Sequence, residues 1–599
     1  MTTVATTTAA QATAAELKAL GAEHLFLMTG RDNTLWIALQ AAGIRQVLAR
    51  TEAAAVYMAD GYARVTGRPT FVYGAYGPGA ANVAGALAEP FWSTSPVIAM
   101  ASTMRRLDRF RSEYQELDQA PLFQSVTKWG VEAATASQVP RFIREAARRS
   151  LAGTPGPVYL GIPGDVYEDE LSGYREPEAA DRPLELPLTR PAPTETDVAA
   201  IVESVARASR PILLVGNGVH QSGGYDELQL LAERLRIPVV TSLAGKGAIP
   251  ETHPLALGTV GRYSRRYANE ALAAADLVLA VGTALGGLVT NSYKLIKPGV
   301  ELIHVAIDPD VLGQNFSTQR AVLADARTFL AMAVAAADRL VASTSPNGRH
   351  RSNGHRPRNG HRARSTSTQG RVGGEQRDAY LAELAEHRSA WHARRIELAS
   401  QDGTDGRPMR PEALLGAVDE LMADDAIVCA DTGYASAWPG GLLELRRAGR
   451  HFFRADGSLG WAFAGAMGAK MAAPGRQVIA VIGDGGFGYQ VADIETAVRL
   501  GLPTVTIILN NGTLAFEAHV QTLLYDHLVP EVDDFLDVDY GAVARAFGAV
   551  GVRVTNAPDA RRALAAALRS DRPTVIDAVI DRDAIAPVTR YDAVRSREL

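Results

Sequence analysis

The chain has 599 residues, of which 47% are hydrophobic and 21% charged, and 61 Lys and Arg against 66 Asp and Glu give a net charge of −5. This slightly acidic balance excludes a dedicated nucleic-acid-binding protein, and the apolar content excludes general disorder. The single cysteine, Cys429, excludes a disulfide framework, and no run of about 18 uncharged apolar residues predicts a membrane span. We therefore expect a cytoplasmic protein with three or four domains.

Short apolar runs alternate with helical patterns in the first block, residues 1–185, which predicts βα units and a parallel sheet. Its predicted strands are HLFLMTG, IRQVLA, PTFVYGAY, SPVIAMAS and GPVYLGIP. A proline-rich, acidic segment around residues 176–197 predicts a linker. A second α/β block, residues 190–342, follows with predicted strands RPILLVGNG, IPVVTSLA, ADLVLAVGT and VELIHVAID.

The segment 343–377 is rich in arginine and histidine, and it contains no acidic residue from Ser343 to Gly374. Because so polar a stretch buries too little apolar surface to offset its ordering entropy, we expect a disordered linker rather than a metal or nucleic-acid site. The third block, residues 378–580, has predicted strands AIVCAD, QVIAVIGD, TVTIILNN and PTVIDAVI, and a tail follows at 581–599. The expected fold class is α/β, with three doubly wound parallel-sheet domains.

The most informative stretch is QVIAVIGDGGFGYQVADIETAVRLGLPTVTIILNN, which predicts a strand–helix–strand unit. Asp484 and Asn511 follow its two strands, at the edge where parallel sheets bind ligands, and their oxygens suit a hard cation such as Mg²⁺. Gly483, Gly485 and Gly486 allow backbone N–H groups to approach a phosphate. The alternative is that GDG and NN are both ordinary turns.

The GDG and NN motifs at this spacing resemble the signature of the thiamine diphosphate (ThDP) enzyme superfamily, and all three blocks match that superfamily in order. The resemblance implies a pyrimidine-binding, a central and a diphosphate-binding domain. It also implies active sites between two subunits, hence a homodimer at minimum and an expected homotetramer. Mg²⁺ would be held by Asp484, Asn511 and the backbone carbonyl of Thr513. Neither nucleic acid nor membrane is an expected partner.

The superfamily requires a glutamate in its first domain, and Glu52, just after the predicted strand IRQVLA, matches it. In relatives this carboxyl is hydrogen-bonded to the aminopyrimidine ring of ThDP and promotes removal of the thiazolium C2 proton, which creates the nucleophile. On its own, Glu52 would be interpreted as a surface helix residue. The chain departs from many relatives at the preceding position, where Thr51 replaces a histidine.

Two glycine-rich stretches, GAYGPGAAN and GSLGWAFAGAMG, match loops that relatives place around the cofactor. The second supplies Leu459, expected to hold the cofactor in its bent shape, with plain core packing as the alternative. The histidine pair of aldehyde-forming relatives is absent, and Ala75 stands in the matching place. The other cofactor contacts expected from these stretches are Gly77, Asn82, Gly457 and Ser458.

Two local matches favour acyl-CoA chemistry, because EYQELDQ and DIETAVRLGLP resemble segments of oxalyl-CoA decarboxylase and 2-hydroxyacyl-CoA lyase. We therefore expect cleavage of the C1–C2 bond of a 2-hydroxyacyl-CoA to formyl-CoA and an aldehyde or ketone. Ala515 replaces a tyrosine of these relatives and would admit a branched substrate such as 2-hydroxyisobutyryl-CoA. The expected proton-handling residues are Tyr114, Gln115, Glu116 and Glu495, each with a structural role as its alternative.

Other functions remain open at this point: an acetolactate synthase-like carboligase, a 2-oxo acid decarboxylase, or a non-catalytic member of the fold. Arg590, Arg595 and Arg597 in the tail would close over the CoA nucleotide, with a solvated terminus as the equal alternative. The central domain of relatives often holds FAD or ADP. Ala284 and Ala306 stand where those relatives have an arginine and an acidic residue, which disfavours FAD in this chain.

Overall fold

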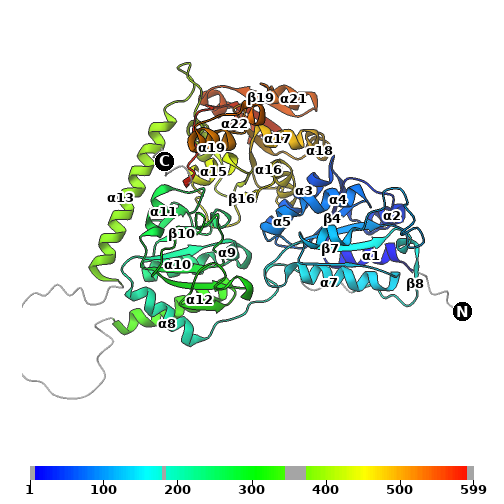
Figure 1. The fold of residues 1–599 in the computed structure, drawn as a ribbon, viewed down its shortest axis with the longest axis horizontal. Helices are drawn as coiled ribbons and strands as arrows, with labels where there is room; N and C mark the ends of the chain where they lie inside the picture. Colours follow the sequence, from blue (N-terminus) through cyan, green and yellow to red (C-terminus); the bar gives the residue numbers. More distant parts are fainter. Residues whose placement is uncertain (1–6, 178–183, 345–372, 590–599) are drawn as a thin grey trace, which may run out of the picture.

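The computed structural model describes residues 7–177, 184–344 and 373–589. Three domains, each built on a six-stranded parallel sheet with helices around it, meet at the centre of the molecule (Figure 1). The predicted α/β class with three parallel-sheet domains is confirmed. Within the described part of the chain, no helix is long and apolar enough to cross a membrane.

In the first domain the strand order is β3-β2-β4-β5-β7-β6, and every pair is parallel. The chain goes from β2 to β3 on one side and then to β4 on the other, so the crevice between β2 and β4 is the topological switch point. The strands are β2 (His24–Leu27), β3 (Arg45–Leu48), β4 (Thr70–Gly74), β5 (Val97–Thr103), β6 (Trp129–Glu132) and β7 (Val158–Pro163). The helices include α1 (Ala9–Ala19), α2 (Asn33–Ala42), α3 (Glu52–Thr66), α4 (Pro78–Ala86), α6 (Ala120–Gln124) and α7 (Val139–Leu151).

The central domain has the order β11-β10-β9-β12-β13-β14, so its switch point lies between β9 and β12. Its strands are β9 (Pro211–Val215), β10 (Val239–Thr241), β11 (Ala256–Thr259), β12 (Leu277–Val281), β13 (Glu301–Ala306) and β14 (Arg320–Leu323). Its helices are α8 (Glu195–Arg207), α9 (Asn217–Ser222), α10 (Tyr225–Leu235), α11 (Arg266–Ala273) and α12 (Ala326–Thr344).

Most of the expected disordered linker lies outside the described residues, but both of its ends are helical. Helix α12 continues to Thr344, and α13 (Gly374–Ala399) begins before the expected boundary at residue 378. Figure 1 shows α13 running along the outer side of the central domain towards the third domain. The expected bounds of the linker therefore need correction at each end, because both flanking helices extend into it.

The third domain repeats the strand order of the first, as β16-β15-β17-β18-β20-β19, with its switch point between β15 and β17. Its strands are β15 (Ile427–Ala430), β16 (Phe452–Arg454), β17 (Val478–Gly483), β18 (Val505–Asn510), β19 (Val550–Val554) and β20 (Thr574–Val579). Its helices include α14 (Pro411–Leu421), α15 (Tyr434–Leu442), α16 (Trp461–Ala472), α17 (Asp484–Gln490), α18 (Ile494–Leu500), α19 (Ala515–Tyr525), α21 (Tyr540–Ala546) and α22 (Ala557–Ala567).

The first and third domains are joined by close packing of α3 on α16. A Cβ atom on Gly468 would stand 1.9 Å from the carbonyl oxygen of Met58, and one on Gly61 would stand 2.1 Å from that of Gly465. The two helix backbones therefore touch, and only glycine permits this approach. This contact fixes the position of the helix that begins at Glu52 relative to the third domain.

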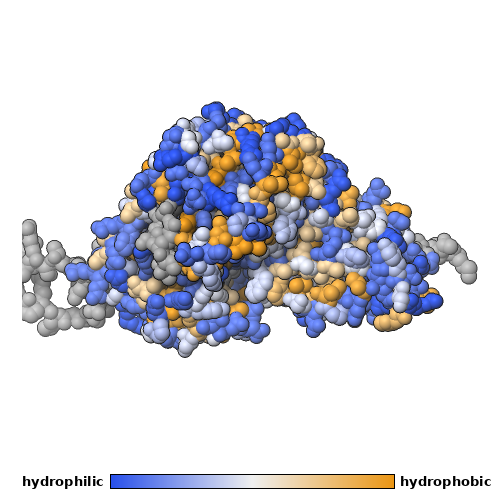
Figure 2. Space-filling view, turned by 45° about the horizontal axis from the view of Figure 1, so that its top comes forward, coloured by the Kyte–Doolittle hydropathy of each residue, from blue (hydrophilic) through white to orange (hydrophobic). Residues whose placement is uncertain are grey.

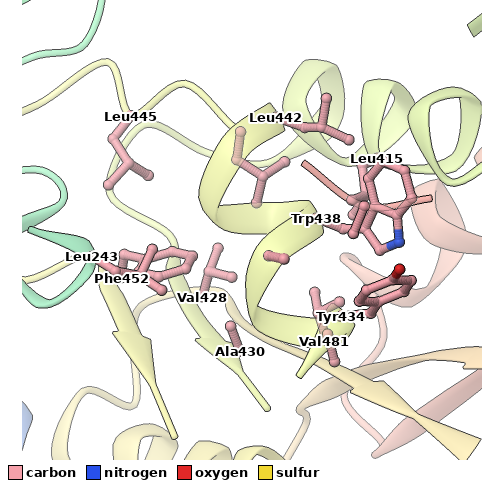
Figure 3. Packing of buried hydrophobic residues seen from close by; sticks show 14 of the residues in the cluster. Leu243, Leu415, Val428, Ala430, Tyr434, Trp438, Leu442, Leu445, Phe452 and Val481 are labelled. Carbon is pink, nitrogen blue, oxygen red and sulfur yellow. The ribbon is translucent and has the colours of Figure 1, made fainter. Parts of the chain in front are cut away.

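The central and third domains share a continuous apolar core. Leu243 of the central domain packs beside Phe452 and Leu445 of the third (Figure 3). A buried ion pair adjoins this core, since Lys246 bonds to Glu251 and also donates to the carbonyl oxygen of Leu443 at 2.7 Å. These two domains therefore pack against each other through a shared core.

Candidate cofactor and active site

The metal-ligand candidates of the third domain lie together at the carboxyl edge of its sheet. Asp484 opens α17 directly after β17, and its Oδ2 accepts a 2.9 Å hydrogen bond from the N–H of Gly512, the neighbour of Asn511. Asp484 is only 4% exposed, and burial raises its pKa to about 6, although N–H donors from Gly485 and Gly512 oppose the shift. Among the described residues, no cationic side chain acts on this carboxylate. A buried carboxylate without a positive partner suits a cationic ligand.

The residues around Asp484 fit a diphosphate held by Mg²⁺. In the described ranges no group of three or more His, Cys, Asp or Glu side chains could hold a metal, so a metal ion here would depend on one carboxylate, the Asn511 amide oxygen and the Thr513 carbonyl. Oxygen donors of this kind are those Mg²⁺ prefers. Open space surrounds the position of a Cβ on Gly483, whereas a Cβ on Gly486 would lie 2.2 Å from Oδ2 of Asp431. Only glycine lets the chain pass so close to that aspartate.

Asp431 connects the two glycine-rich candidate segments of this domain, and it was not predicted from the sequence. It follows β15, across the switch point from Asp484, and its carboxylate accepts hydrogen bonds from Gly460 N–H at 3.0 Å and Ala462 N–H at 3.2 Å. Asp431 therefore holds the start of α16, next to Leu459, against the loop at Gly486. The sequence feature that could have identified Asp431 is its position at the end of the predicted strand AIVCAD.

Replacing Asp431 with Asn is expected to change how the stability of the cofactor-free protein depends on pH. Burial raises the pKa of Asp431 from the ordinary 3.8 to about 7, although the N–H groups of Gly460 and Ala462 oppose the shift. Between these values the folded state binds more protons than the unfolded state, so the wild type loses stability as pH rises from about 4 to 7. At about 1.4 kcal/mol per pH unit the loss approaches about 4 kcal/mol.

The measurement is the unfolding free energy of the cofactor-free wild type and Asp431→Asn at several pH values. As pH rises, the unfolding free energy of the wild type should fall relative to that of the Asp431→Asn variant. The matched control is Asp571→Asn on the exposed surface. A wild-type to Asp431→Asn difference that stays constant between pH 5 and pH 8 would contradict the proton assignment.

In the first domain the structure brings Glu52 and Asn82 together. Glu52 is the first residue of α3, whose N-cap Thr51 accepts a 3.0 Å hydrogen bond from the Ala54 N–H. The Nδ2 group of Asn82 donates to Oε2 of Glu52 at 3.1 Å. Oε1 lies 3.2 Å from where a Cβ on Gly79 would stand. The glycine-rich turn after β4 therefore faces the Glu52 carboxyl.

The residues just before Glu52 also touch the third domain of the same chain. Arg50 donates its backbone N–H to Oδ1 of Asp493 at 2.8 Å, and Oγ1 of Thr51 lies 3.4 Å from Oε1 of Gln490. Gln490 ends the helix that Asp484 begins, about 9 Å along its axis at 1.5 Å per residue. The Glu52 loop and Asp484 thus lie near opposite ends of one short helix.

The expected proton-handling residues divide between a loop and a domain contact. Tyr114, Gln115 and Glu116 lie between β5 and α6, where the Glu116 carboxylate accepts the N–H groups of Phe110 and Glu113. The carbonyl oxygen of Gln115 would be 2.3 Å from a Cβ on Gly77, so this loop packs on the glycine-rich turn.

Glu495 forms ion pairs with Arg50 and Arg499, at 2.9 Å each. Partial burial opposes ionisation of Glu495, but these two arginines outweigh it and the pKa is lowered. Its carboxylate is therefore held as an anion at the contact between the first and third domains.

The remaining candidates lie in different parts of the chain. Gly457, Ser458 and Leu459 form the loop between β16 and α16, and Glu89 accepts the Ser458 N–H at 3.2 Å. Ala515 is buried at the start of α19. The tail reaches the central domain, where the Thr589 N–H donates to the Arg262 carbonyl at 2.9 Å. The candidates Arg590, Arg595 and Arg597 lie outside the described residues.

Models of the thiamine pyrophosphate enzyme match three parts of the chain in order. The N-terminal TPP binding domain matches residues 7–122, the central domain 198–333 and the C-terminal TPP binding domain 431–578, together more than half of the chain. The chain belongs to the thiamine pyrophosphate enzyme family. It is therefore an enzyme with ThDP-binding domains at both ends.

Relatives of this ThDP enzyme carry two kinds of name. The probable acetolactate synthase large subunit of Methanocaldococcus jannaschii is 28% identical over 96% of this chain and 92% of its own. The acetolactate synthase large subunit of Corynebacterium glutamicum is 28% identical over 90% of this chain and 81% of its own length. The sulfoacetaldehyde acetyltransferase of Castellaniella defragrans is 28% identical over 92% of this chain and 89% of its own length.

The expected cleavage of a 2-hydroxyacyl-CoA is wrong for this ThDP enzyme, because these relatives are named acetolactate synthases. The acyl-CoA substrate and the formyl-CoA product, which were expected with that reaction, are wrong as well. In the structure, Glu116 accepts hydrogen bonds within its own loop, and Glu495 pairs with Arg50 across a domain contact. The alternative of an acetolactate synthase-like carboligase is better supported.

A cavity of about 590 Å³ lies where the three domains of the ThDP enzyme meet. It opens at the switch point of the central sheet, where Asn217 follows β9 and Thr283 follows β12. Ala284 and Ala306, the positions that disfavoured FAD, both line it and bring no charge. The switch point of the central sheet therefore opens into a cavity in this chain.

Proposed function

We propose that this enzyme is a ThDP- and Mg²⁺-dependent carboligase that acts on 2-oxo acids, in the manner of an acetolactate synthase. The observation that carries the proposal is the pairing of Glu52 with Asn82 in a chain that aligns over 96% of its length with a relative of that name. The set of Asp484 and Asn511 supplies the second half of the cofactor site.

In this proposal the third domain holds the diphosphate end of the cofactor. Asp484, Asn511 and the carbonyl of Thr513 bind Mg²⁺, and the backbone from Gly483 to Gly486 approaches the phosphates. Leu459 supports the middle of the cofactor, on a loop that Asp431 anchors. When bound, ThDP supplies an electron sink for the carbanion chemistry of a 2-oxo acid.

The first domain supplies the group that transfers a proton at the aminopyrimidine end of the cofactor. Glu52 holds a proton at the aminopyrimidine ring, and Asn82 orients its carboxyl by donating to Oε2. That bond leaves Oε1 directed at the glycine-rich turn. Because no histidine stands at the positions used by aldehyde-forming relatives, we assign the acid–base role of this edge to Glu52.

A homodimer is the minimum assembly that we propose, with a tetramer as a pair of dimers. Leu107 and Phe110, on the loop beside the Glu52 turn, are 86% and 95% exposed, and Leu536 near the diphosphate motif is 87% exposed. Figure 2 shows apolar side chains gathered over the third domain and again over the first. Large apolar side chains in an ordered loop are typical of a surface that another chain covers.

The test is incubation of the purified enzyme with ThDP, Mg²⁺ and a panel of 2-oxo acids that includes pyruvate. We expect CO₂ release and formation of acetolactate, both dependent on ThDP. Full cofactor binding without turnover of any 2-oxo acid would contradict the carboligase assignment.

A further inference from the structure

An arginine and a tyrosine meet across the switch point of the first sheet. Arg31 follows β2 and Tyr76 follows β4, and Nη1 of Arg31 donates to the Tyr76 hydroxyl at 2.9 Å. Ligands of open parallel sheets bind at this place, outside the carboxyl ends of the strands on either side of the switch point. The hydrogen bond therefore holds a guanidinium at the ligand-binding crevice of the domain.

The Arg31 guanidinium is exposed and its bond is to a neutral partner. Three other arginines at the same end of the domain are neutralised, since Arg50 pairs with Glu495, Arg106 with Asp165 and Asp169, and Arg109 with Glu132. Among the residues that the structure describes, Arg31 pairs with no carboxylate and instead contacts the hydroxyl and ring of Tyr76. Four of its five N–H donors thus remain for a ligand.

Sheet order places this guanidinium next to the catalytic carboxyl. Strand β2 lies between β3, whose loop leads into Glu52, and β4, whose turn carries Tyr76. Both side chains contact the turn from residue 74 to residue 79, because Tyr76 bonds to Arg31 while Gly79 faces Oε1 of Glu52. The carboxyl edge of the first sheet therefore carries both the Glu52 carboxyl and a positive charge.

We propose that Arg31, positioned by Tyr76, binds the negatively charged carboxylate or sulfonate group of the carbonyl substrate. The inference rests on the proposed function and names the substrate class, a small carbonyl compound with a carboxylate or sulfonate near the reacting carbon. The planar fork of a guanidinium binds such groups through two parallel N–H donors, which a lysine cannot reproduce. Arg31 acts in binding and orientation, and Glu52 retains the proton chemistry.

The kinetic test compares Arg31→Gln with the wild-type holoenzyme. A lost charge-assisted hydrogen bond predicts a KM for pyruvate raised about 10- to 100-fold, with kcat changed much less and KM for a neutral aldehyde acceptor unchanged. Arg31→Lys should recover part of the loss, and Tyr76→Phe should show a smaller rise in KM. The matched control is Arg45→Gln, an exposed arginine at the opposite end of β3.

An equilibrium measurement separates this inference from the proposed function. Calorimetry of the protein loaded with Mg²⁺ and a ThDP analogue that lacks the reactive C2 carbon should show wild type binding pyruvate more tightly than its neutral methyl ester, and Arg31→Gln binding the two alike. A parallel series with sulfoacetaldehyde distinguishes a sulfonate from a carboxylate ligand. The Arg31 assignment is overturned if wild type binds neither pyruvate nor sulfoacetaldehyde more tightly than the neutral methyl ester. This outcome does not depend on whether the enzyme turns pyruvate over.

Discussion

Replacing Glu52 with Gln is expected to lower kcat by about 10²- to 10⁴-fold, the range of a lost general acid–base group. The amide has nearly the same size, and its oxygen still accepts the bond from Asn82, so the local structure should persist. What is lost is the ability to hold and release a proton at the aminopyrimidine. ThDP affinity should change little, because the proposed Mg²⁺ and diphosphate contacts lie in the third domain.

Three measurements separate these effects. Steady-state kinetics give kcat, fluorescence titration gives the Kd for ThDP at fixed Mg²⁺, and NMR gives the rate at which bound ThDP exchanges its C2 proton with D₂O. Exchange should slow together with kcat. Glu203→Gln, the same change on an exposed side chain of α8, is the matched control. A variant that keeps fast exchange but loses kcat would assign Glu52 to a later step.

The fold could largely be predicted from apolar runs, and the strands that were missed share one property. In the six-stranded sheets the five missed strands, β6, β11, β14, β16 and β19, all lie at an edge, and the short pair β1 (Thr7–Thr8) and β8 (Glu170–Leu171), which forms a sheet of its own, was missed as well. An edge strand has a neighbour on one side only, so it lacks the continuous apolar run of a central parallel strand. In β14, for example, three of four residues are exposed. The pattern that identifies buried strands has nothing to detect there.

The candidate site could be predicted where neighbouring strand ends carry the motif. Asp484 and Asn511 follow adjacent strands, so sheet topology alone brings them together. Asp431 and Arg31 were missed because their roles depend on contacts with distant residues, such as the bonds from Gly460 to Asp431 and from Arg31 to Tyr76. The substrate was assigned wrongly because that expectation rested on two short local matches, whereas the relatives named acetolactate synthase align over more than 90% of the chain.

Co-expression of a Glu52→Gln chain with an Asp484→Asn chain is expected to restore activity that neither variant has alone. Each substitution removes one half of the proposed site, the proton-handling carboxyl or the Mg²⁺ ligand. If every site joins the first domain of one chain to the third domain of its partner, a mixed dimer contains one intact site. Random pairing would then give about a quarter of the wild-type activity, since half of the dimers are mixed.

The alternative, a site built within one chain, predicts no recovery at all, because every chain carries one defect. We expect recovery because the loop beside Glu52 presents Leu107 and Phe110 to solvent, as a surface that a second chain covers would. The experiment needs differently tagged chains, so that mixed dimers can be purified and their activity per ThDP bound measured. Mixing two chains that both carry Asp484→Asn is the control, and it should remain inactive under every condition.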